Sequence, residues 1–331
     1  MIDFTYERAT SVGDVVAKLN SLRTAKPIAG GTNLLDLMKE GNERPEHLID
    51  LSHLPLRAIE ELPGGSLRIG ATATNSEVAY HSLVESRYPL LSKAILAGAS
   101  AQLRNMATVG GNLLQRTRCA YFYDVNTRCN KREPGEGCSA IGGLNRNHAI
   151  LGTSRACIAT NPSDMSVALA ALAAKVTVTG IKGDRTIAFA DFHRLPGETP
   201  QLDTNLEPGE LILHVDLEPP LHSAHSAYVK ARERNSYAFA LVSCAAALEI
   251  DDGKIRSARL ALGGVAHKPW RVPEAEELLS GEPIERPDFE GAAARLLEGA
   301  RGYGHNDFKI PLAKRVIVRA LQTALRGEEN P

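Results

Sequence analysis

Three of the five cysteines of this 331-residue chain lie within twenty residues, at Cys119, Cys129 and Cys138. A fourth, Cys157, follows a stretch with little apolar material and much glycine, asparagine and arginine. In a reducing compartment, clustered cysteines are more often metal-binding or catalytic than disulfide-bonded. The segment 115–160 is therefore the first place in the sequence where the residue types predict chemistry.

The spacing of these four cysteines leaves three interpretations open. Structural zinc favours C-x2–4-C pairs, whereas nine, eight and 18 residues separate these cysteines. Two disulfides are arithmetically possible but are typical of secreted chains. An iron–sulfur cluster needs four thiolates and sets no fixed spacing when a long loop can wrap around it. The fifth cysteine, Cys244, stands in the apolar run "LVSCAAALEI" and is expected to be an inert core thiol.

Two glycine pairs form a second candidate site. "AGGTNLL" (29–35) and "VGGNLL" (109–114) share two glycines, a polar residue and two leucines. Paired glycines let a bulky anion approach the backbone, and free N–H groups at a helix start bind phosphate. Two tight structural turns would fit the same letters. Two such turns suit a dinucleotide, which has two phosphates, so the sequence leaves both interpretations open.

Composition excludes several classes of protein. The chain has 38 Lys and Arg against 39 Asp and Glu, a formal net charge of −1, without the basic surplus of a nucleic-acid-binding protein. The apolar run 165–174 is too short to span a bilayer, which takes about 20 residues. The first residues lack a basic region followed by an apolar one, so we expect no signal peptide on this chain. We therefore expect a soluble chain that folds in the cytoplasm.

Regular elements flank the cysteine segment on both sides. Residues 1–50 predict strand, helix, strand, helix and strand, with Ser11 as the first helix cap. Asn75 or Ser76 is expected to cap a later helix, and Ser163 the helix 163–176. Beyond the Pro- and His-rich stretch 218–226 come three strands, two joined by a "DDG" hairpin turn, and then helices. The order of elements predicts an α+β fold.

Four motifs in order resemble one family: "KPIAGGTNLLDLMKEG", "LRNMATVGGNLLQRTRC", "ACIATNPSDMSVALAAL" and "YVKARERNSYAFALVS". They are similar to the FAD-binding subunits of molybdenum hydroxylases, the family of xanthine dehydrogenase, carbon monoxide dehydrogenase and aldehyde oxidoreductases. The resemblance implies an FAD-binding domain of the xanthine dehydrogenase/vanillyl-alcohol oxidase (PCMH) type at 1–220, with subdomains at about 1–54 and 55–220. It implies a domain like the carbon monoxide dehydrogenase flavoprotein C-terminal domain at 221–331.

The resemblance also assigns cofactor-binding residues. The FAD pyrophosphate would be wrapped by Lys26, Pro27, Ile28, Ala29, Gly30, Gly31, Thr32, Asn33 and Leu34, with Thr108 and Gly111 completing the cradle. Asp164 would bind the polar chain of the flavin, Ile212 would contact the ring edge through its backbone, and Lys230 would lie near the ring. Candidates to stack on the ring are Tyr121, Phe122, Tyr123 and Tyr237.

The cysteine segment narrows the resemblance. It looks like the loop of the flavin subunits of bacterial periplasmic aldehyde oxidoreductases, with a related insertion in 4-hydroxybenzoyl-CoA reductase. That likeness implies a [4Fe-4S] cluster on Cys119, Cys129, Cys138 and Cys157. Basic side chains are expected around the cluster, since its thiolates carry negative charge: Arg116, Arg118, Arg128, Lys131 and Arg132.

The function that the resemblance implies is electron transfer, with no catalytic residue on this chain. Partner chains would be a large molybdenum-cofactor subunit and a small [2Fe-2S] subunit, in a heterotrimer or a dimer of heterotrimers. Electrons would leave at the flavin to an external acceptor. The complex would reach the periplasm with a partner that carries a twin-arginine signal, or would stay in the cytoplasm. Two alternatives are a self-sufficient flavin oxidoreductase and a non-enzymatic module with a zinc or disulfide loop.

Overall fold

The computed structural model describes residues 1–327. Its N-terminal part is a small parallel sheet with two helices. Its elements are β1 (Thr5–Arg8), α1 (Val12–Ser21), β2 (Ala25–Ile28), α2 (Leu34–Lys39) and β3 (His47–Asp50). The strands pair in the order β1-β3-β2. Ser11 caps α1 by accepting a hydrogen bond from the Asp14 N–H at 3.1 Å. The predicted alternation of strands and helices and the predicted cap are both confirmed.

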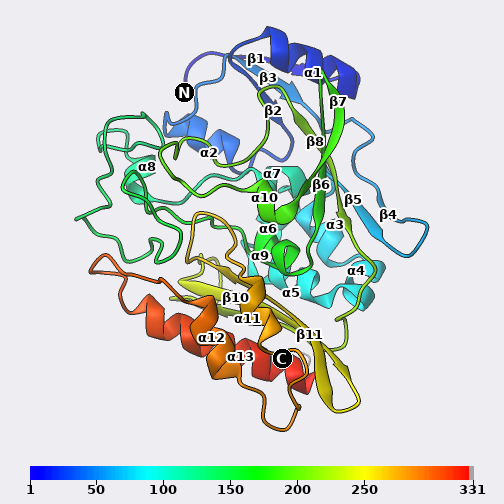
Figure 1. Cartoon of the computed structure of the whole chain (residues 1–331). Coiled ribbons are helices and arrows are strands. Elements are labelled where there is room, and N and C mark those ends of the chain that lie inside the picture. The colour runs from blue at the N-terminus through cyan, green and yellow to red at the C-terminus, as the bar shows by residue number, and fades with distance from the viewer. Residues whose placement is uncertain (328–331) are drawn as a thin grey trace.

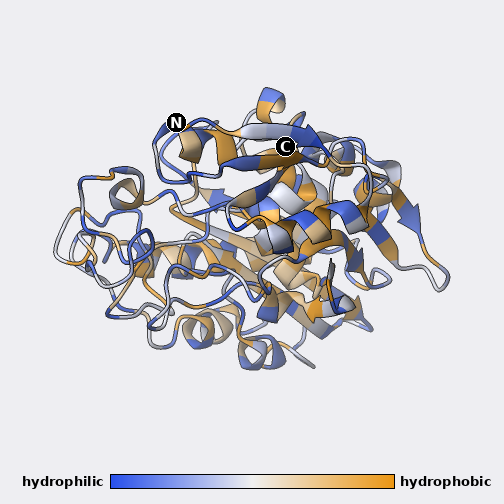
Figure 2. Cartoon of the chain, turned by 90° about the horizontal axis from the view of Figure 1, so that it is seen from above, coloured by the Kyte–Doolittle hydropathy of each residue, from blue (hydrophilic) through white to orange (hydrophobic). Residues whose placement is uncertain are grey.

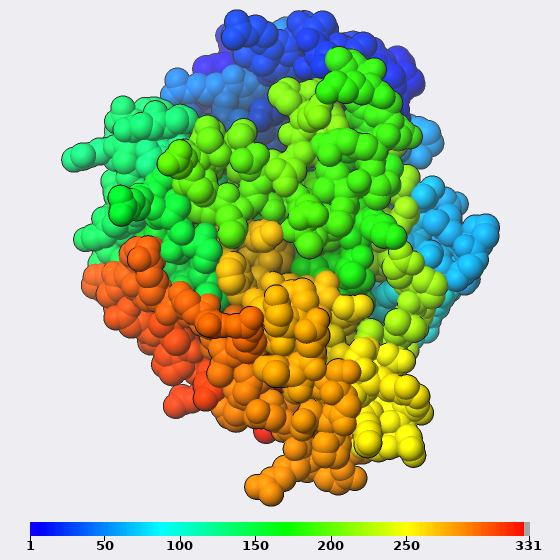
Figure 3. Space-filling view, viewed as in Figure 1, coloured from blue at the N-terminus to red at the C-terminus, as the bar shows by residue number. Residues whose placement is uncertain are grey.

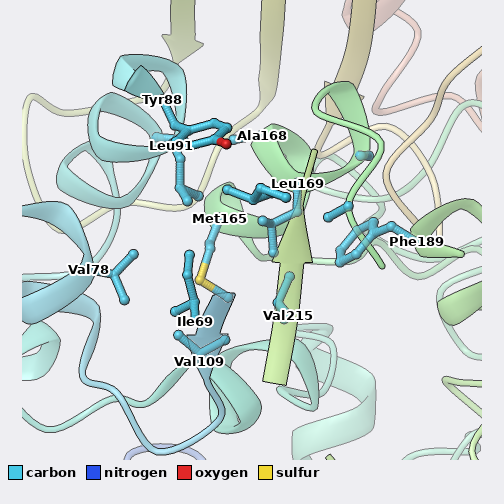
Figure 4. Close-up of a cluster of buried hydrophobic side chains, with 14 of the residues drawn as sticks. Ile69, Val78, Tyr88, Leu91, Val109, Met165, Ala168, Leu169, Phe189 and Val215 are labelled. Carbon is cyan, nitrogen blue, oxygen red and sulfur yellow. The ribbon is translucent and has the colours of Figure 1, made fainter. Parts of the chain in front are cut away.

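The central part is a five-stranded sheet in the order β4-β5-β8-β6-β7. Its strands are β4 (Ile59–Glu61), β5 (Leu67–Gly70), β6 (Lys175–Gly180), β7 (Gly183–Ala188) and β8 (Leu211–Leu217). Helices cover it: α3 (Asn75–Ala79), α4 (Ser82–Arg87), α5 (Pro89–Ala97), α6 (Ala101–Arg104), α7 (Val109–Leu113), α9 (Asp164–Ala171) and α10 (Phe189–Phe192). Figure 4 shows Met165 and Leu169 of α9 between Val78 on one side and Val215 on the other, in the largest hydrophobic core.

The cap of α3 differs from the prediction. Thr74, and neither Asn75 nor Ser76, occupies the N-cap position. Its hydroxyl accepts from the Glu77 N–H at 3.2 Å, and the Glu77 carboxylate accepts from the Thr74 N–H at 2.9 Å. This reciprocal pair is a capping box, which needs Glu or Gln three residues after the cap. Thr74 is the cap because Glu77 lies three residues after it, whereas no Glu or Gln lies three residues after Asn75 or Ser76.

The C-terminal part is an antiparallel sheet in the order β11-β10-β9, covered on both faces. Its elements are β9 (Ser226–Ala231), β10 (Val242–Asp251), β11 (Lys254–Gly263), α11 (Pro273–Glu277), α12 (Phe289–Leu296) and α13 (Lys309–Arg326). Alternate residues of β10 separate by face: Cys244 and Leu248 join the core under the C-terminal helices, whereas Ala245 and Ala247 join the core with α5 and α9. Alanines on that face let the helices of the central part approach the sheet closely.

The N-terminal sheet and the C-terminal helices lie at opposite ends of the molecule, and the central part separates them (Figures 1 and 3). Figure 2 shows hydrophobic segments running through the packed helices and strands, with hydrophilic segments along the outer loops. The longest helix, α13, is amphipathic and buries Ile317 and Leu321 against the sheet. No helix within residues 1–327 combines the length and apolar character needed to cross a membrane.

The segment 115–160 is irregular, as predicted, apart from the single turn α8 (Ala120–Tyr123). It lies at one side of the molecule, between the N-terminal sheet and the C-terminal helices (Figure 1). Asn42 of the N-terminal part donates to the Tyr123 carbonyl, and Asn145 donates to the Tyr303 carbonyl. The cysteine segment is thus tied to both ends of the fold.

Candidate functional site

A cavity of about 900 Å³ opens where the N-terminal part, the central helices and the C-terminal sheet meet. A volume of this size fits a cofactor-sized ligand. Its wall includes residues from every part of the chain that carries a family motif. Six of the residues predicted to bind cofactor or metal line it: Thr32, Asn33, Gly111, Cys119, Asp164 and Lys230.

The first glycine turn presents backbone donors to this cavity. Gly31 has a φ of +67°, in the left-handed region that glycine tolerates. Within residues 1–327, the N–H groups of Gly31, Thr32 and Asn33 donate to no acceptor. Successive free N–H groups in such a turn form an anion-binding concavity. The turn can therefore offer backbone donors to an anion, and phosphate binding at this turn stays a prediction.

Gly30 is a glycine for a different reason. A Cβ at this position would stand 1.7 Å from the Met106 carbonyl oxygen and 2.5 Å from its carbon. The two segments that carry the glycine pairs therefore touch each other, backbone against backbone. A side chain at Gly30 would prevent this contact between residues 29–31 and 106–107. The fold itself therefore requires glycine at this position.

The second glycine turn is the start of a helix whose donors are already used. Thr108 caps α7 by accepting from the Gly111 N–H at 3.3 Å. The Val109 and Gly110 N–H groups donate to the carbonyls of Ala73 and Ala71. The expectation of free N–H groups therefore fails at this turn, because the carbonyls of the turn that follows β5 accept from them. Gly111 is exposed and lines the cavity, so the absence of a side chain there leaves room for a ligand.

Asp164 and Lys230 are partners in the structure. The Lys230 ammonium lies 2.8 Å from the Asp164 carboxylate, and both side chains are more than nine-tenths buried. The Tyr228 hydroxyl donates to the other Asp164 oxygen at 2.6 Å. Burial and the Asp164 charge raise the pKa of Tyr228 well above its usual value. This group joins the start of α9 to β9 at the cavity wall, and so couples the central part to the C-terminal sheet.

Removing one partner of this pair tests how much the pair contributes to the stability of the fold. Lys230→Met is expected to lower the free energy of unfolding by about 3–5 kcal/mol, because it leaves the Asp164 carboxylate buried without its counter-ion. Urea denaturation measures this loss. The double variant Lys230→Met/Asp164→Asn removes both charges and is expected to recover part of it. A single variant as stable as the parent chain would show that the pair contributes nothing.

The remaining residues predicted for FAD lie away from the cavity wall. Lys26 pairs with Glu43 at 3.3 Å, and Ile212 is buried in β8 within the central core. The others belong to β2 or its flanks, or begin a helix: Pro27, Ile28, Ala29, Leu34 and Thr108. Each of these therefore stays a prediction that rests on the resemblance.

Five cavity residues hold buried polar atoms that have no hydrogen-bond partner in the described part of the chain: Asn33 Nδ2, Asn75 Oδ1, Arg104 Nε, Arg118 Nε and His148 Nδ1. The sequence had suggested Asn33 for FAD and Arg118 for the surroundings of the cluster, but it gave no binding role to Asn75, Arg104 or His148. Buried polar atoms are normally paired, so a cavity with several orphans fits a polar ligand. A large part of FAD is a polar chain with two phosphates; Arg104 and Arg118 offer cationic donors suited to phosphate, and the asparagines offer a neutral donor and an acceptor.

Of the aromatic residues considered for ring stacking, Tyr237 lines the cavity and Phe122 is fully buried in a small core beside Leu37. Phe239, which the sequence interpretation did not consider, also lines the cavity. The Arg118 guanidinium lies 5.1 Å from the Phe239 ring centroid. Tyr237 and Phe239 are exposed, and their sequence signal is their place in the fourth family motif.

The four cysteines of the segment 115–160 come together in space. Cys129 and Cys138 face each other in an antiparallel bridge, flanked by hydrogen bonds from Asn130 N–H to Gly137 and from Ser139 N–H to Arg128. In such a non-hydrogen-bonded pair the two side chains project close together on one face. Burial raises the pKa of Cys119 and Cys157 most; the charges of Cys129 and Cys157 add to the shift at Cys119, and those of Cys138 and Cys129 add to it at Cys157. Cys157 therefore interacts electrostatically with each of the other three thiols.

Two of these thiols, Cys119 and Cys157, are protonated at neutral pH when no metal is bound. Burial raises the pKa of Cys119 to about 12 and that of Cys157 to about 11. All five cysteines of the chain are free. Cys244 is fully buried in β10, and burial alone raises its pKa strongly, as expected of an inert core thiol. Binding of a metal group by the clustered thiols would release their protons.

The geometry of the thiols bears on the zinc interpretation. Within residues 1–327, no three histidine, cysteine, aspartate or glutamate side chains converge so that they could hold a single metal ion. A mononuclear zinc site needs such convergence, with Zn–S distances of about 2.3 Å. In a [4Fe-4S] cube each cysteine binds a different iron, so its four sulfurs stand apart.

Side chains bonded to backbone hold this segment in place of an apolar core. Asn130 accepts from the N–H groups of Gly135 and Gly137 and donates to the Ala156 carbonyl at 2.9 Å. Arg132 donates to the carbonyls of residues 121, 122, 125 and 127. The polar side chains that give this segment the composition of a loop are therefore the same side chains that hold its backbone in place.

Lys131, Asp203 and Arg116 form a buried ionic group close to Cys157. Lys131 is almost fully buried and lies 2.5 Å from Asp203, which also accepts from Arg116 at 2.8 Å. Burial would raise the pKa of Asp203, but Lys131 and Arg116 outweigh it and lower that pKa to about 2. The Lys131 charge also lowers the pKa of Cys157 against the effect of burial. Of the basic residues expected around the thiols, Lys131 is the one that shifts a thiol pKa in this way.

Comparison with known proteins decides the family. The profile described as "FAD binding domain in molybdopterin dehydrogenase" matches residues 2–219, and "CO dehydrogenase flavoprotein C-terminal domain" matches residues 226–324. The chain belongs to this family of FAD-binding subunits. It is thus the FAD-binding medium subunit of a molybdenum hydroxylase and part of an oxidoreductase, and the predicted α+β fold is confirmed.

Individual relatives cover the chain almost completely. It is 51% identical over 325 residues to the aldehyde oxidoreductase FAD-binding subunit PaoB of Escherichia coli, covering 97% of this chain and 98% of that protein. It is 27% identical to the carbon monoxide dehydrogenase medium chain of Afipia carboxidovorans, covering 99% and 98%. Among solved structures, quinoline 2-oxidoreductase from Pseudomonas putida 86 superposes with a TM-score of 0.75 at 26% identity, covering 98% of each chain.

Proposed function

We propose that this chain is the FAD- and [4Fe-4S]-carrying electron-transfer subunit of a molybdenum-dependent aldehyde oxidoreductase. The observation that carries the proposal is the grouping of four thiols beside the cavity, with Cys119 on the cavity wall. Two redox groups on one chain are useful when electrons arrive singly and leave at a flavin. The aldehyde assignment is supported by 51% identity to a subunit named for aldehyde oxidation.

FAD would be held by the residues whose donors face the cavity. Thr32 and Asn33 would meet the pyrophosphate with backbone N–H groups, and Gly111 would leave room for it. Asn75 and Arg104 would offer their unpaired atoms to the polar chain. When bound, FAD supplies a ring that exchanges electrons either singly or in pairs. This chain binds and orients that ring, and the substrate is oxidised on a partner chain.

The cluster would be held by Cys119, Cys129, Cys138 and Cys157, as the resemblance implies. A [4Fe-4S] cluster on these thiolates carries one electron at a time. Lys131 stands beside Cys157 and offsets part of the negative charge of the thiolates. The ion pair with Asp203 holds Lys131 at that position. We infer that this buried group stabilises the loaded state of the loop as well as its fold.

The partners in this proposal are a large molybdenum-cofactor subunit and a small [2Fe-2S] subunit, in a heterotrimer or a dimer of heterotrimers. An external acceptor receives the electrons at the flavin. The complex is exported to the periplasm with a twin-arginine partner or stays in the cytoplasm. The domain limits at 1–220, with subdomains at about 1–54 and 55–220, and at 221–331 stay predictions; residues 328–331 lie outside the described part.

Two alternatives differ in what they require of the chain. One is the flavin subunit of another molybdenum hydroxylase, of the xanthine, carbon monoxide or aromatic acyl-CoA type. The other is a stand-alone flavin oxidoreductase. Relatives named for xanthine and carbon monoxide dehydrogenases are 26% and 27% identical to the chain, about half the identity to the aldehyde oxidoreductase subunit. This difference favours the aldehyde assignment.

Reconstitution with partners tests the proposed function. The chain is purified alone and as the complex obtained by co-expression with its genomic neighbours, and each is mixed anaerobically with an aldehyde, xanthine or NADH. We expect aldehyde to reduce the flavin of the complex and none of the three to reduce the isolated chain. Reduction of the isolated chain by NADH or aldehyde would overturn the subunit role. Reduction of the complex by xanthine alone would overturn the aldehyde assignment.

A further inference from the structure

His148 joins the cysteine group to the flavin cavity. Its Nε2 atom lies 3.1 Å from the Cys119 sulfur. Among the four clustered cysteines, Cys119 is the one that lines the cavity in the described part of the chain, and His148 lines the cavity beside it. The Cys119 sulfur and the His148 ring therefore form the wall that the thiol group and the cavity share.

The backbone of His148 is fixed from two sides. Its N–H donates to the Asn145 carbonyl at 2.9 Å, and its own carbonyl accepts from the Lys309 ammonium at 2.9 Å and from Asn306 Nδ2 at 3.2 Å. Lys309 and Asn306 are both fully buried. Anchors from the C-terminal helix region thus hold a ring of the cysteine segment at a fixed place.

The ring itself is also confined. His148 is buried, and its ring centroid lies 6.2 Å from that of Tyr121 at 45°. The protonated Cys119 thiol of the metal-free chain can itself donate, but a thiolate ligand has no proton, so with the cluster bound the ring nitrogen is the donor in this contact. The hydrogen bonds to the His148 backbone and the packing against Tyr121 already hold the ring in place. An N–H hydrogen bond from the ring to the sulfur therefore costs little further conformational entropy.

We propose that His148 is a positioning residue for the cluster, donating its Nε2–H to the Cys119 sulfur and thereby raising the reduction potential of the [4Fe-4S] group at the edge that faces FAD. The inference rests on the proposed function. Hydrogen bonds to cluster sulfurs stabilise the reduced form, which carries one more negative charge, and so raise the potential. The flavin-facing ligand is where such tuning bears most directly on transfer between the two groups.

Redox titration followed by electron paramagnetic resonance tests this inference on the full chain in its complex. His148→Phe keeps a planar ring without a donor, and His148→Gln retains an N–H donor. We expect His148→Phe to lower the cluster midpoint potential by an amount equal to at least a tenfold change in the reduction equilibrium, about 59 mV for one electron. His148→Gln is expected to restore at least half of that shift.

The possible outcomes separate the inference from the proposed function. If the parent chain holds no [4Fe-4S] cluster, the proposed function fails. If it holds one and His148→Phe leaves the potential unchanged, only the inference is overturned. Loss of iron from His148→Phe and from His148→Gln alike would show a purely structural role and would also overturn it. An equal shift of the flavin and cluster potentials would contradict a local hydrogen bond.

Discussion

Cys129→Ser is expected to abolish the [4Fe-4S] signal in the electron paramagnetic resonance spectrum of the reduced chain and to remove about four non-flavin irons. Cys129 is buried and faces Cys138 across a β-bridge, so a substitution there affects two neighbouring ligands at once. A serine hydroxyl is a poor replacement, because iron–sulfur clusters are held by thiolates. FAD content is expected to stay near that of the parent, since Cys129 does not line the cavity.

Cys244→Ala is the matched control for this variant. Cys244 is fully buried in β10, in the core under the C-terminal helices. Its loss should cost on the order of 1 kcal/mol of packing and leave iron and FAD unchanged. An unchanged spectrum in Cys129→Ser would refute the ligand assignment, and iron loss in Cys244→Ala would show that the wrong cysteine was excluded.

Gly30→Ala is expected to prevent stable folding, whereas Gly111→Ala should fold normally. The added methyl at Gly30 would lie 1.7 Å from the Met106 carbonyl oxygen, and the clashing atoms belong to the backbone and cannot rotate away. We expect a destabilisation above about 4 kcal/mol, the range of severe core disruption. The yield of folded chain and urea denaturation measure this effect.

Gly111→Ala tests the cavity instead of the fold. The nearest atom to a Cβ there is Thr108 Oγ1 at 3.1 Å, and the helical position favours alanine over glycine by about 1 kcal/mol. We therefore expect unchanged or higher stability with reduced FAD retention, because the methyl group enters the cavity. Parental stability in Gly30→Ala, or full FAD retention in Gly111→Ala, would contradict these assignments.

Local signals in the sequence predicted much of the fold. The N-terminal alternation follows from apolar periodicity, and Ser11 was recognisable as a cap. The hairpin between β10 and β11 follows from "DDG", because Asp252 and Gly253 both adopt positive φ as a two-residue turn requires. Strand β7 was missed, since "GDRTIA" has one buried residue and therefore no clear alternation.

Contacts between distant residues could not be predicted in the same way. Asp164 pairs with Lys230 across 66 positions, and Gly30 packs on Met106 from an unrelated segment. The donors of α7 are occupied by carbonyls of Ala71 and Ala73, which no local pattern records. The sequence could name residues expected to bind the flavin, but only the fold shows which of them line the cavity, which pair with each other and which hold two segments in contact.

Metal and flavin analysis of the full chain, purified anaerobically without partners, tests the central claim most directly. We predict about four non-flavin irons, equal acid-labile sulfide and one FAD per chain. Expression without the [2Fe-2S] partner ensures that all iron belongs to this chain. One zinc per chain, or no metal with five titratable thiols, would contradict the claim that this subunit carries a [4Fe-4S] cluster beside its flavin.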